Sequence, residues 1–142
     1  MADKKPVKKE TIANASGKRK RAIARATAKK GTGIVKINNK PVELIDPITT
    51  RLRIQEPVLL AEDLAKNVNI HVNVTGGGWS SQAEASRLAI AKVLIEFTKS
   101  AELKKKYLDY DRHLLVADTR YKEAKKPGTH GHARKKRQLS FR

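Results

Sequence analysis

The chain has 142 residues, of which 32 are Lys or Arg and 14 are Asp or Glu, and its formal net charge at pH 7 is +18. This length fits a single domain and excludes most multidomain enzymes, and so large an excess of cations is unusual for a metabolic enzyme. The absence of Cys excludes disulfides and thiolate chemistry, and four His alone argue against a structural zinc site.

The N-terminal part of the chain is predicted to be a flexible leader followed by a meander of strands. The leader is residues 1–16, which are polar and basic. Residues 18–30 alternate Ala with larger side chains, which predicts one strand whose small-residue face packs closely against a helix. Turns are expected at 31–33 and 38–39, and short extended segments at 34–37 and 41–44.

The middle of the chain is predicted to contain helices and one clear strand. Asp46-Pro47 is typical of a helix start with an acidic N-cap, and Glu56-Pro57 is expected to divide that helical region into two short pieces. Apolar and polar residues alternate over 69–75, which predicts a half-buried strand. After three glycines, Ser81 opens a capping-box pattern, so we expect a core helix that runs to about Thr98.

The C-terminal part is predicted to contain a basic helix at 101–107, a short apolar strand at 114–117 and a tail at 125–142 with seven Lys or Arg and no acid. The tail has too few apolar residues to offset its ordering entropy, so we expect it to be disordered in isolation. The order of elements predicts one α+β domain, residues 17–124, with a sheet covered largely on one face. No apolar run approaches the roughly 18 residues that span a bilayer, so we expect a cytoplasmic protein without membrane contact.

The excess positive charge is confined to the two ends of the chain. Residues 1–36 hold 12 Lys or Arg and two acids, and residues 112–142 hold ten and two, whereas residues 37–111 hold ten of each sign. The neutral middle can fold by burying apolar surface, but the ends need anions from elsewhere. Nucleic acid is therefore the expected partner.

Two basic clusters are the strongest candidates for this contact. An ordinary solvated face is the alternative for both, but such a face normally carries its own balancing acids. The first cluster consists of Lys18, Arg19, Lys20, Arg21, Arg25, Lys29 and Lys30, and the second of Arg134, Lys135, Lys136 and Arg137.

The glycine run between the predicted strand and helix has three interpretations. Gly76-Gly77-Gly78, with Ser80 and Ser81 after it, is compatible with a tight turn, with an RNA phosphate contact and with a nucleotide site. A P-loop needs Gly-Lys-Ser/Thr, and the chain has Trp79 at the lysine position, which disfavours the nucleotide site.

No catalytic arrangement stands out, because the chain shows no acid–base pair and no nucleophile with its base. His71 is interpreted as a hydrogen-bonded structural residue, and the two His of the tail lack acidic or thiol neighbours that would complete a metal site. We therefore expect no enzyme activity, no metal and no cofactor. With 4% aromatic residues, base stacking is a minor contribution unless Trp79, Tyr121 or Phe141 is placed for it.

Seven motifs follow one another along nearly the whole chain after the leader. They are Gly17-Lys18-Arg19-Lys20 with Ala22 to Arg25, Gly31-Thr32-Gly33, Ile37-Asn38, Gly76-Gly77-Gly78 with Ser81-Gln82-Ala83, Asp118-Thr119-Arg120, Glu123-Ala124-Lys125-Lys126-Pro127-Gly128, and Ala133-Arg134 through Gln138 with Ser140-Phe141-Arg142. In this order they resemble the small-subunit ribosomal protein S-nine family in its archaeal and eukaryotic-like form. Ser81 replaces a glycine of the bacterial motif, which supports the archaeal form. Leu139 stands where a lysine is common, which argues against a phosphate contact there.

The resemblance implies a fold like the second domain of ribosomal protein S-five, with a mixed sheet, a left-handed βαβ crossover and an extended basic C-terminal tail. It implies a structural protein in the head of the small ribosomal subunit that is not a homo-oligomer. Small-subunit rRNA and neighbouring head proteins are the implied partners. The implied rRNA-binding residues are those of the first cluster, the glycine run with Ser80 and Ser81, and Arg120, Lys125, Lys126 and Arg134.

The resemblance also implies that the tail reaches the anticodon stem-loop of peptidyl-site tRNA during translation. Arg142 is then the tRNA-proximal residue, and Lys135, Lys136, Arg137 and Ser140 lead to it.

Two rival functions are compatible with the residues alone. Basic ends around a neutral domain also suit a free-standing basic nucleic-acid-binding protein, and the glycine run would suit a small phosphotransferase. Preference for folded small-subunit rRNA over duplex DNA at equal salt separates the ribosomal function from the first rival. Nucleotide binding would support the second.

Overall fold

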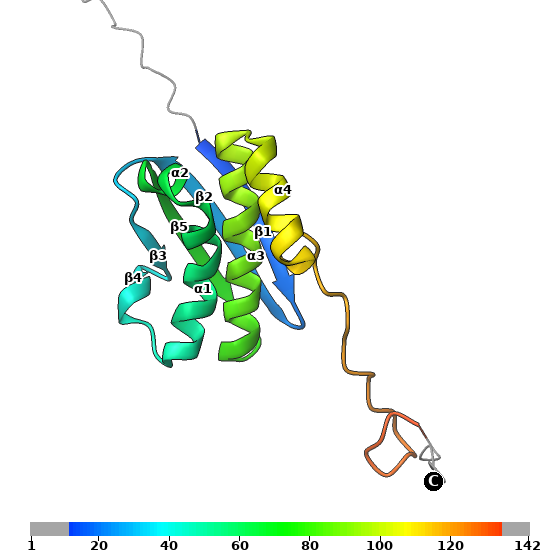
Figure 1. The fold of residues 1–142 in the computed structure, drawn as a ribbon. Coiled ribbons are helices and arrows are strands. Elements are labelled where there is room, and N and C mark those ends of the chain that lie inside the picture. Colours follow the sequence, from blue (N-terminus) through cyan, green and yellow to red (C-terminus); the bar gives the residue numbers. More distant parts are fainter. Residues whose placement is uncertain (1–11, 135–142) are drawn as a thin grey trace, which may run out of the picture.

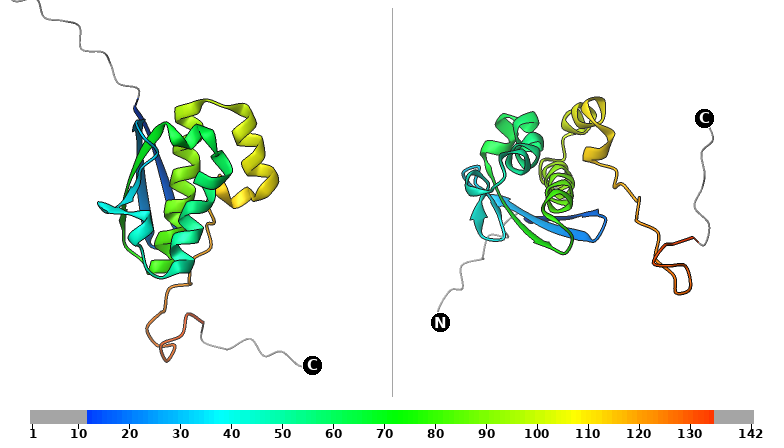
Figure 2. Two further views of the ribbon diagram at one scale, coloured as in Figure 1. Left: turned by 60° about the vertical axis from the view of Figure 1, so that its left-hand side comes forward. Right: turned by 90° about the horizontal axis from the view of Figure 1, so that it is seen from below.

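A five-stranded sheet carries the helices on one of its two faces (Figures 1 and 2). The structure, a computed structural model, describes residues 12–134. The strands are β1 (Ile12–Arg19), β2 (Ala22–Lys30), β3 (Val35–Ile37), β4 (Lys40–Pro41) and β5 (Val68–Thr75). The helices are α1 (Ile48–Ala61), α2 (Asp63–Lys66), α3 (Trp79–Thr98) and α4 (Ala101–Tyr110), with 3-10 turns η1 (Val42–Leu44) and η2 (Arg112–Leu114).

The sheet is mixed, in the order β1-β2-β5-β3-β4. β2 lies antiparallel between β1 and β5, whereas β3 runs parallel to β5 and antiparallel to β4. In Figure 1, β3 and β5 both run downwards, α1 returns upwards in front of them, and β5 lies to the right of β3. This crossover is left-handed, the opposite of the usual hand. The predicted α+β class, the mixed sheet and its one-sided helical cover are therefore confirmed.

The core lies between the sheet and α3. α3 can approach β2 closely because the side chains on the inward face of β2 are small. Its four Ala are buried, as their alternation predicted. On β1, Gly17 allows a still closer approach, since a Cβ there would lie 2.2 Å from the carbonyl oxygen of Ala85 in α3. Apolar side chains of β5, among them Ile70 and Val72, fill the core beside this contact.

The prediction of one strand over 18–30 is wrong, because the chain reverses at Lys20-Arg21 and forms a hairpin. β1 begins at Ile12, so residues 12–16, expected in the leader, belong to the sheet. The inward residues of β1 are Ala13, Ala15, Gly17 and the ion-paired Arg19, which together form no regular alternation that would reveal a strand. The rest of the expected leader, residues 1–11, lies outside the described residues.

Two predicted features of the first helical region are also wrong. Asp46 is not the N-cap of α1, which begins at Ile48 with Pro47 in the capping position. Pro57 does not divide the region, because α1 continues through it. Pro57 is buried, and its carbonyl oxygen accepts a hydrogen bond from Tyr107 of α4. Packing here outweighs the one backbone hydrogen bond that a helical proline removes.

The other helix and strand boundaries differ from the predicted ones by only a few residues. α3 begins at Trp79 with Gly78 as its N-cap, so Ser81 lies in the first turn and is not the cap. The segments expected to be extended at 41–44 and 114–117 contain 3-10 turns and irregular chain. A short apolar run suits a buried turn as well as a strand. The strand over 69–75, the end of α3 and the basic helix after it are confirmed.

Candidate nucleic-acid interface

Two loops that are far apart in the sequence meet at one end of the sheet. The β1–β2 turn carries Lys20 and Arg21, and the β5–α3 loop is the glycine run. A Cβ at Gly76 would lie 2.5 Å from the carbonyl oxygen of Arg21. A Cβ at Gly77 would lie 3.0 Å from the amide nitrogen of Ala22. Both glycines have positive φ, 76° and 68°, so this contact requires glycine. We call Lys20, Arg21 and the glycine run the basic end.

The N-terminus of α3 opens onto the basic end. Gly78 is the N-cap, and Ser80 and Ser81 lie in the first turn, where a helix leaves amide N–H groups without an intrahelical acceptor. Trp79 is 60% exposed at the same place. The glycine run is therefore a tight strand-to-helix turn that also presents donors beside two cations, a combination that suits anions such as phosphate.

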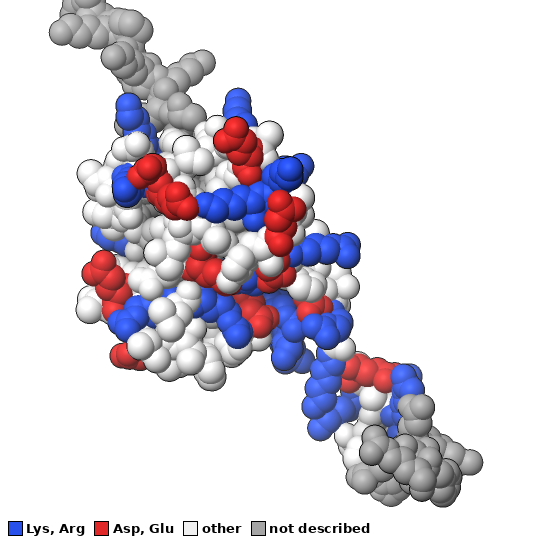
Figure 3. Space-filling view, in the orientation of Figure 1, with Lys and Arg blue, Asp and Glu red and all other residues white. Residues whose placement is uncertain are grey.

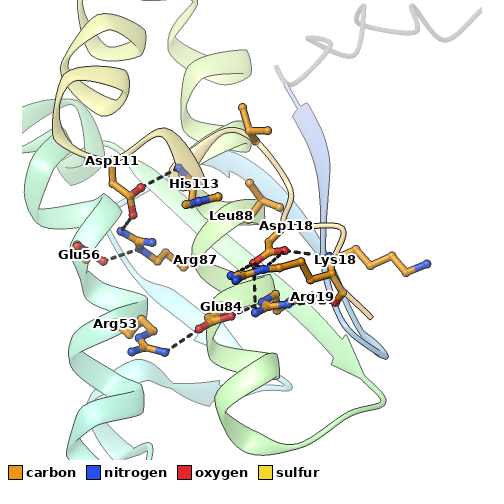
Figure 4. A pocket seen from close by; sticks show the side chains of 12 residues that line it. Lys18, Arg19, Arg53, Glu56, Glu84, Arg87, Leu88, Asp111, His113 and Asp118 are labelled. Carbon is orange, nitrogen blue, oxygen red and sulfur yellow. Dashed lines mark hydrogen bonds and ion pairs between the residues drawn. The ribbon is translucent and has the colours of Figure 1, made fainter. Parts of the chain in front are cut away.

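An ion-pair network that the sequence did not predict lies near the basic end (Figure 4). The Arg19 guanidinium contacts Glu84 of α3 at 2.6 Å and Asp118 at 3.2 Å. Glu84 also contacts Arg53 of α1 at 3.0 Å. These four side chains line a polar hollow of about 370 Å³. The network joins β1, α1 and α3 to the segment that leads into the tail.

Asp118 is held most tightly by its neighbour Arg120. Arg120 donates to the carboxylate from its side chain at 2.6 Å and from its backbone amide at 2.9 Å. These hydrogen bonds, with the charges of Arg120 and Arg19, hold the pKa of Asp118 well below its usual range. Arg120, predicted to bind rRNA, stays 81% exposed. A phosphate at Arg120 would therefore share the guanidinium with a carboxylate.

A second cluster in the same hollow joins α4 to α1 and α3. The Arg87 guanidinium lies 2.5 Å from Glu56 and 2.8 Å from Asp111. Burial raises the pKa of Asp111, but hydrogen bonds from the His113 amide and from Arg87 outweigh it and lower that pKa. Asp111, the C-cap of α4, is therefore paired with Arg87 of α3. Its partners lie too far away in the sequence for any local pattern to reveal them.

The chain leaves the domain beside this network and extends away from it (Figure 1). The Lys18 ammonium lies 5.5 Å from the ring centroid of Tyr121, a cation–π contact. Farther out, Arg134 pairs with Glu123 at 3.1 Å, and residues 125–126 are exposed. The predicted tRNA-proximal residues Lys135, Lys136, Arg137, Ser140 and Arg142, and also Leu139, lie outside the described residues.

Not every predicted rRNA-binding cation lies at the basic end. Lys29 and Lys30 are at the opposite end of β2, and Arg25 lies midway along it on the face away from the helices. His71, interpreted as hydrogen-bonded, is exposed on that same face, and its imidazole has no hydrogen-bond partner in the described part of the chain. The structure therefore divides the first cluster between two surfaces.

Within residues 12–134, no group of three or more His, Asp or Glu is arranged to hold a metal ion. None of the helices in that range is long and apolar enough to cross a membrane.

The chain is similar to known proteins over most of its length. Residues 17–142 match the family model described as ribosomal protein S9/S16. Small ribosomal subunit protein uS9 of Methanothrix thermoacetophila is 49% identical over 131 residues, which cover 92% of this chain and 98% of that protein. The proteins of the same name from Desulfurococcus amylolyticus and Thermoplasma acidophilum are 53% and 51% identical, over 92% and 89% of this chain and 93% and 98% of theirs.

Proposed function

Because the chain belongs to the ribosomal protein S9/S16 family, we propose that it is a structural protein of the small ribosomal subunit and works in the cytoplasm as part of the ribosome. The names of its relatives support this subunit. The protein binds and positions RNA as a single copy beside neighbouring proteins of the subunit head. We assign it no catalytic step and no cofactor.

The basic end is the observation that carries this proposal. Lys20 and Arg21 have no acidic partner among residues 12–134, and they lie beside the first amides of α3. Cations and amide donors that converge on one spot bind phosphate oxygens, and RNA is the phosphate-rich partner that a small subunit provides. Trp79 adds an exposed ring that can stack on a base.

The tail extends the same electrostatic contact beyond the domain. The Arg19–Asp118 pair ties the base of the tail to the domain, so the direction of the tail is set before its cations meet RNA. Lys125, Lys126 and Arg134 then contact rRNA. The residues beyond them reach the anticodon stem-loop of peptidyl-site tRNA and hold it by charge and position.

Sedimentation of the tagged full-length protein from cell lysate through sucrose gradients, at low and high salt, tests the proposal. We expect the protein in the small-subunit peak at both salt concentrations, because an integral protein is held by many contacts at once. A protein that stays at the top of the gradient, or leaves the particle at modest salt, would instead be a free-standing nucleic-acid-binding protein.

A further inference from the structure

Within residues 12–134, no helix or strand covers the sheet face opposite the helices (Figure 2), and the strands that form it carry no acidic residue. The right-hand view of Figure 2 shows the helices above the sheet and no described helix or strand beneath it. None of the five strands contains an Asp or Glu, so the acids of residues 12–134 all lie in helices and loops. We call this surface the open face.

The strand register places four cations on the open face. Side chains alternate between the two faces of a strand, and the alternate residues of β1, β2 and β5 are buried against the helices. The residues between them point outwards, which places Lys18, Arg25 and Lys29 on the open face. Lys36 of β3 pairs with the outward His71 of β5, so it lies on the same face.

Uncharged polar side chains lie between these cations. One row across the sheet runs from Asn14 through Thr27 and His71 to Lys36. Thr27 donates a 2.8 Å hydrogen bond to the Asn14 amide oxygen, which leaves the amide NH₂ of Asn14 directed elsewhere. Amide, hydroxyl and imidazole groups of this kind hydrogen-bond phosphate and ribose oxygens.

The open-face cations lack the carboxylate partners that some cations on the helix side have. Arg25, Lys29 and Lys36 have no carboxylate within ion-pair distance among the described residues, whereas on the helix side Lys106 has one and Arg87 has two. Figure 3 shows both signs of charge interspersed over the helices. Positive charge that no acid of the chain balances attracts an anion from outside.

The composition of the open face fits RNA better than an acidic protein. Protein interfaces centre on aromatic or apolar anchors, but the strands contain no Phe, Tyr or Trp. Ile12, at one end of β1, is the only large apolar side chain exposed on them. The same lack of aromatic rings removes base stacking, so the contact is to phosphate and sugar.

We propose that the open face is a second RNA-binding surface, which holds the phosphodiester backbone of rRNA through Arg25, Lys29 and Lys36 without reading its bases. The proposal rests on the proposed function, because the RNA is that of the small subunit. The surface is distinct from the basic end. Contacts on two surfaces would fix the orientation of the domain on the RNA, which contact at one loop end cannot do.

Two double variants of the full chain with equal charge changes test the proposal. Arg25→Gln with Lys36→Gln removes two open-face cations, and Lys104→Gln with Lys105→Gln removes two exposed cations of α4 as the control. The probe is an archaeal small-subunit rRNA transcript, bound over a series of KCl concentrations. For the open-face variant we expect weaker binding and a slope of log K against log salt that is shallower by roughly 1.4 to 1.8, about 0.7 to 0.9 per lost phosphate contact. The control should keep the wild-type slope.

Acylation of lysines in the wild-type protein provides a second measurement that does not depend on how the variants fold. We expect bound rRNA to protect Lys29 and Lys36 more than Lys104. Equal slopes for the two double variants, or equal protection, would overturn the open-face proposal. Protection in the assembled subunit but not by rRNA alone would overturn it in favour of an acidic protein partner. A wild-type protein that does not bind rRNA would instead contradict the proposed function.

Discussion

The phenol hydroxyl of Tyr107 donates a 2.6 Å hydrogen bond to the backbone carbonyl oxygen of Pro57. This contact joins α4 to the middle of α1 at the residue where α1 lacks a backbone donor. Tyr107 is fully buried, and burial raises the pKa of its phenol well above the usual value. The proline that suggested a break in the helix is therefore part of the junction between two helices.

Tyr107→Phe should lower the free energy of unfolding by about 1 kcal/mol, because it removes a buried hydrogen bond while it keeps the ring. Urea denaturation at pH 7 and 25 °C measures this change. Tyr121→Phe is the control, since Tyr121 is 53% exposed and its ring contact with Lys18 survives the substitution. Equal stability of both variants and the wild type would show that the hydrogen bond contributes nothing.

Gly17→Ala should destabilise the domain by about 1–3 kcal/mol, the usual cost of overpacking. The new Cβ would lie 2.2 Å from the Ala85 carbonyl oxygen and 2.8 Å from the Ala89 amide nitrogen, so α3 must move away from β1. Thermal unfolding checks this against Ser16→Ala, an exposed neighbour on the same strand that should change stability by less than about 0.5 kcal/mol. A Gly17 variant as stable as the Ser16 variant would contradict the close contact.

Asp118→Asn should remove part of the acid sensitivity of folding. The pKa of Asp118 is lowered in the folded protein by Arg120 and Arg19, so its contribution is present above the unfolded pKa near 4 and is lost as pH falls below it. The stability difference between wild type and variant should therefore be largest at neutral pH and shrink towards pH 3. Asp109→Asn is the control, because Asp109 is exposed and has no ion pair in the described range. A difference that stays constant with pH would refute the assignment.

Lys20→Ala with Arg21→Ala should reduce incorporation into the small subunit while the domain stays folded. Both side chains are exposed, whereas the adjacent Arg19 is paired with Glu84 and must be left in place. Quantitative mass spectrometry of gradient-purified subunits measures occupancy against tagged wild type in the same cells. Normal occupancy would exclude the basic end as an essential rRNA contact.

Deletion of Arg142 should weaken binding of peptidyl-site tRNA to isolated small subunits without reducing their yield. We expect this because the proposed tRNA contact is electrostatic and is assigned to the tail, whereas docking on rRNA is assigned to the domain. Filter binding of tRNA to purified variant subunits measures the effect. Unchanged tRNA affinity would contradict the proposed contact between the tail and tRNA.

Sequence patterns predicted the elements whose side chains reveal which face is buried. β5 alternates Val and Ile with polar residues, and the Ala face of β2 indicated a helix packed closely on it. The patterns failed for β1, because its inward face combines Ala13 and Gly17 with the ion-paired Arg19 and so shows no regular alternation. They failed at Pro57 because a tertiary contact with Tyr107 outweighs local preference.

The candidate site also contains residues that the sequence predicted and residues that only the structure revealed. The separation of charge predicted an anionic partner for a cluster that includes Lys20 and Arg21. The position of the glycine run between a strand and a helix made it a second candidate, and the structure brings the two together. The Arg19 network was missed because its members are far apart in the sequence and each resembles an ordinary surface charge. The open face was missed because it depends on strand register, and the sequence alone does not reveal that Lys36 of β3 lies beside His71 of β5.

The sequence by itself determined that a neutral, foldable middle lies between two basic ends, and it placed the motifs in an order that identified the family. These are properties of composition and spacing along the chain, which do not depend on folding. Only the tertiary structure decided which cations remain available to RNA, because availability depends on whether folding brings a carboxylate within reach. Arg19 is paired with Glu84 and Asp118, whereas Lys20, the next residue, has no acidic partner among residues 12–134.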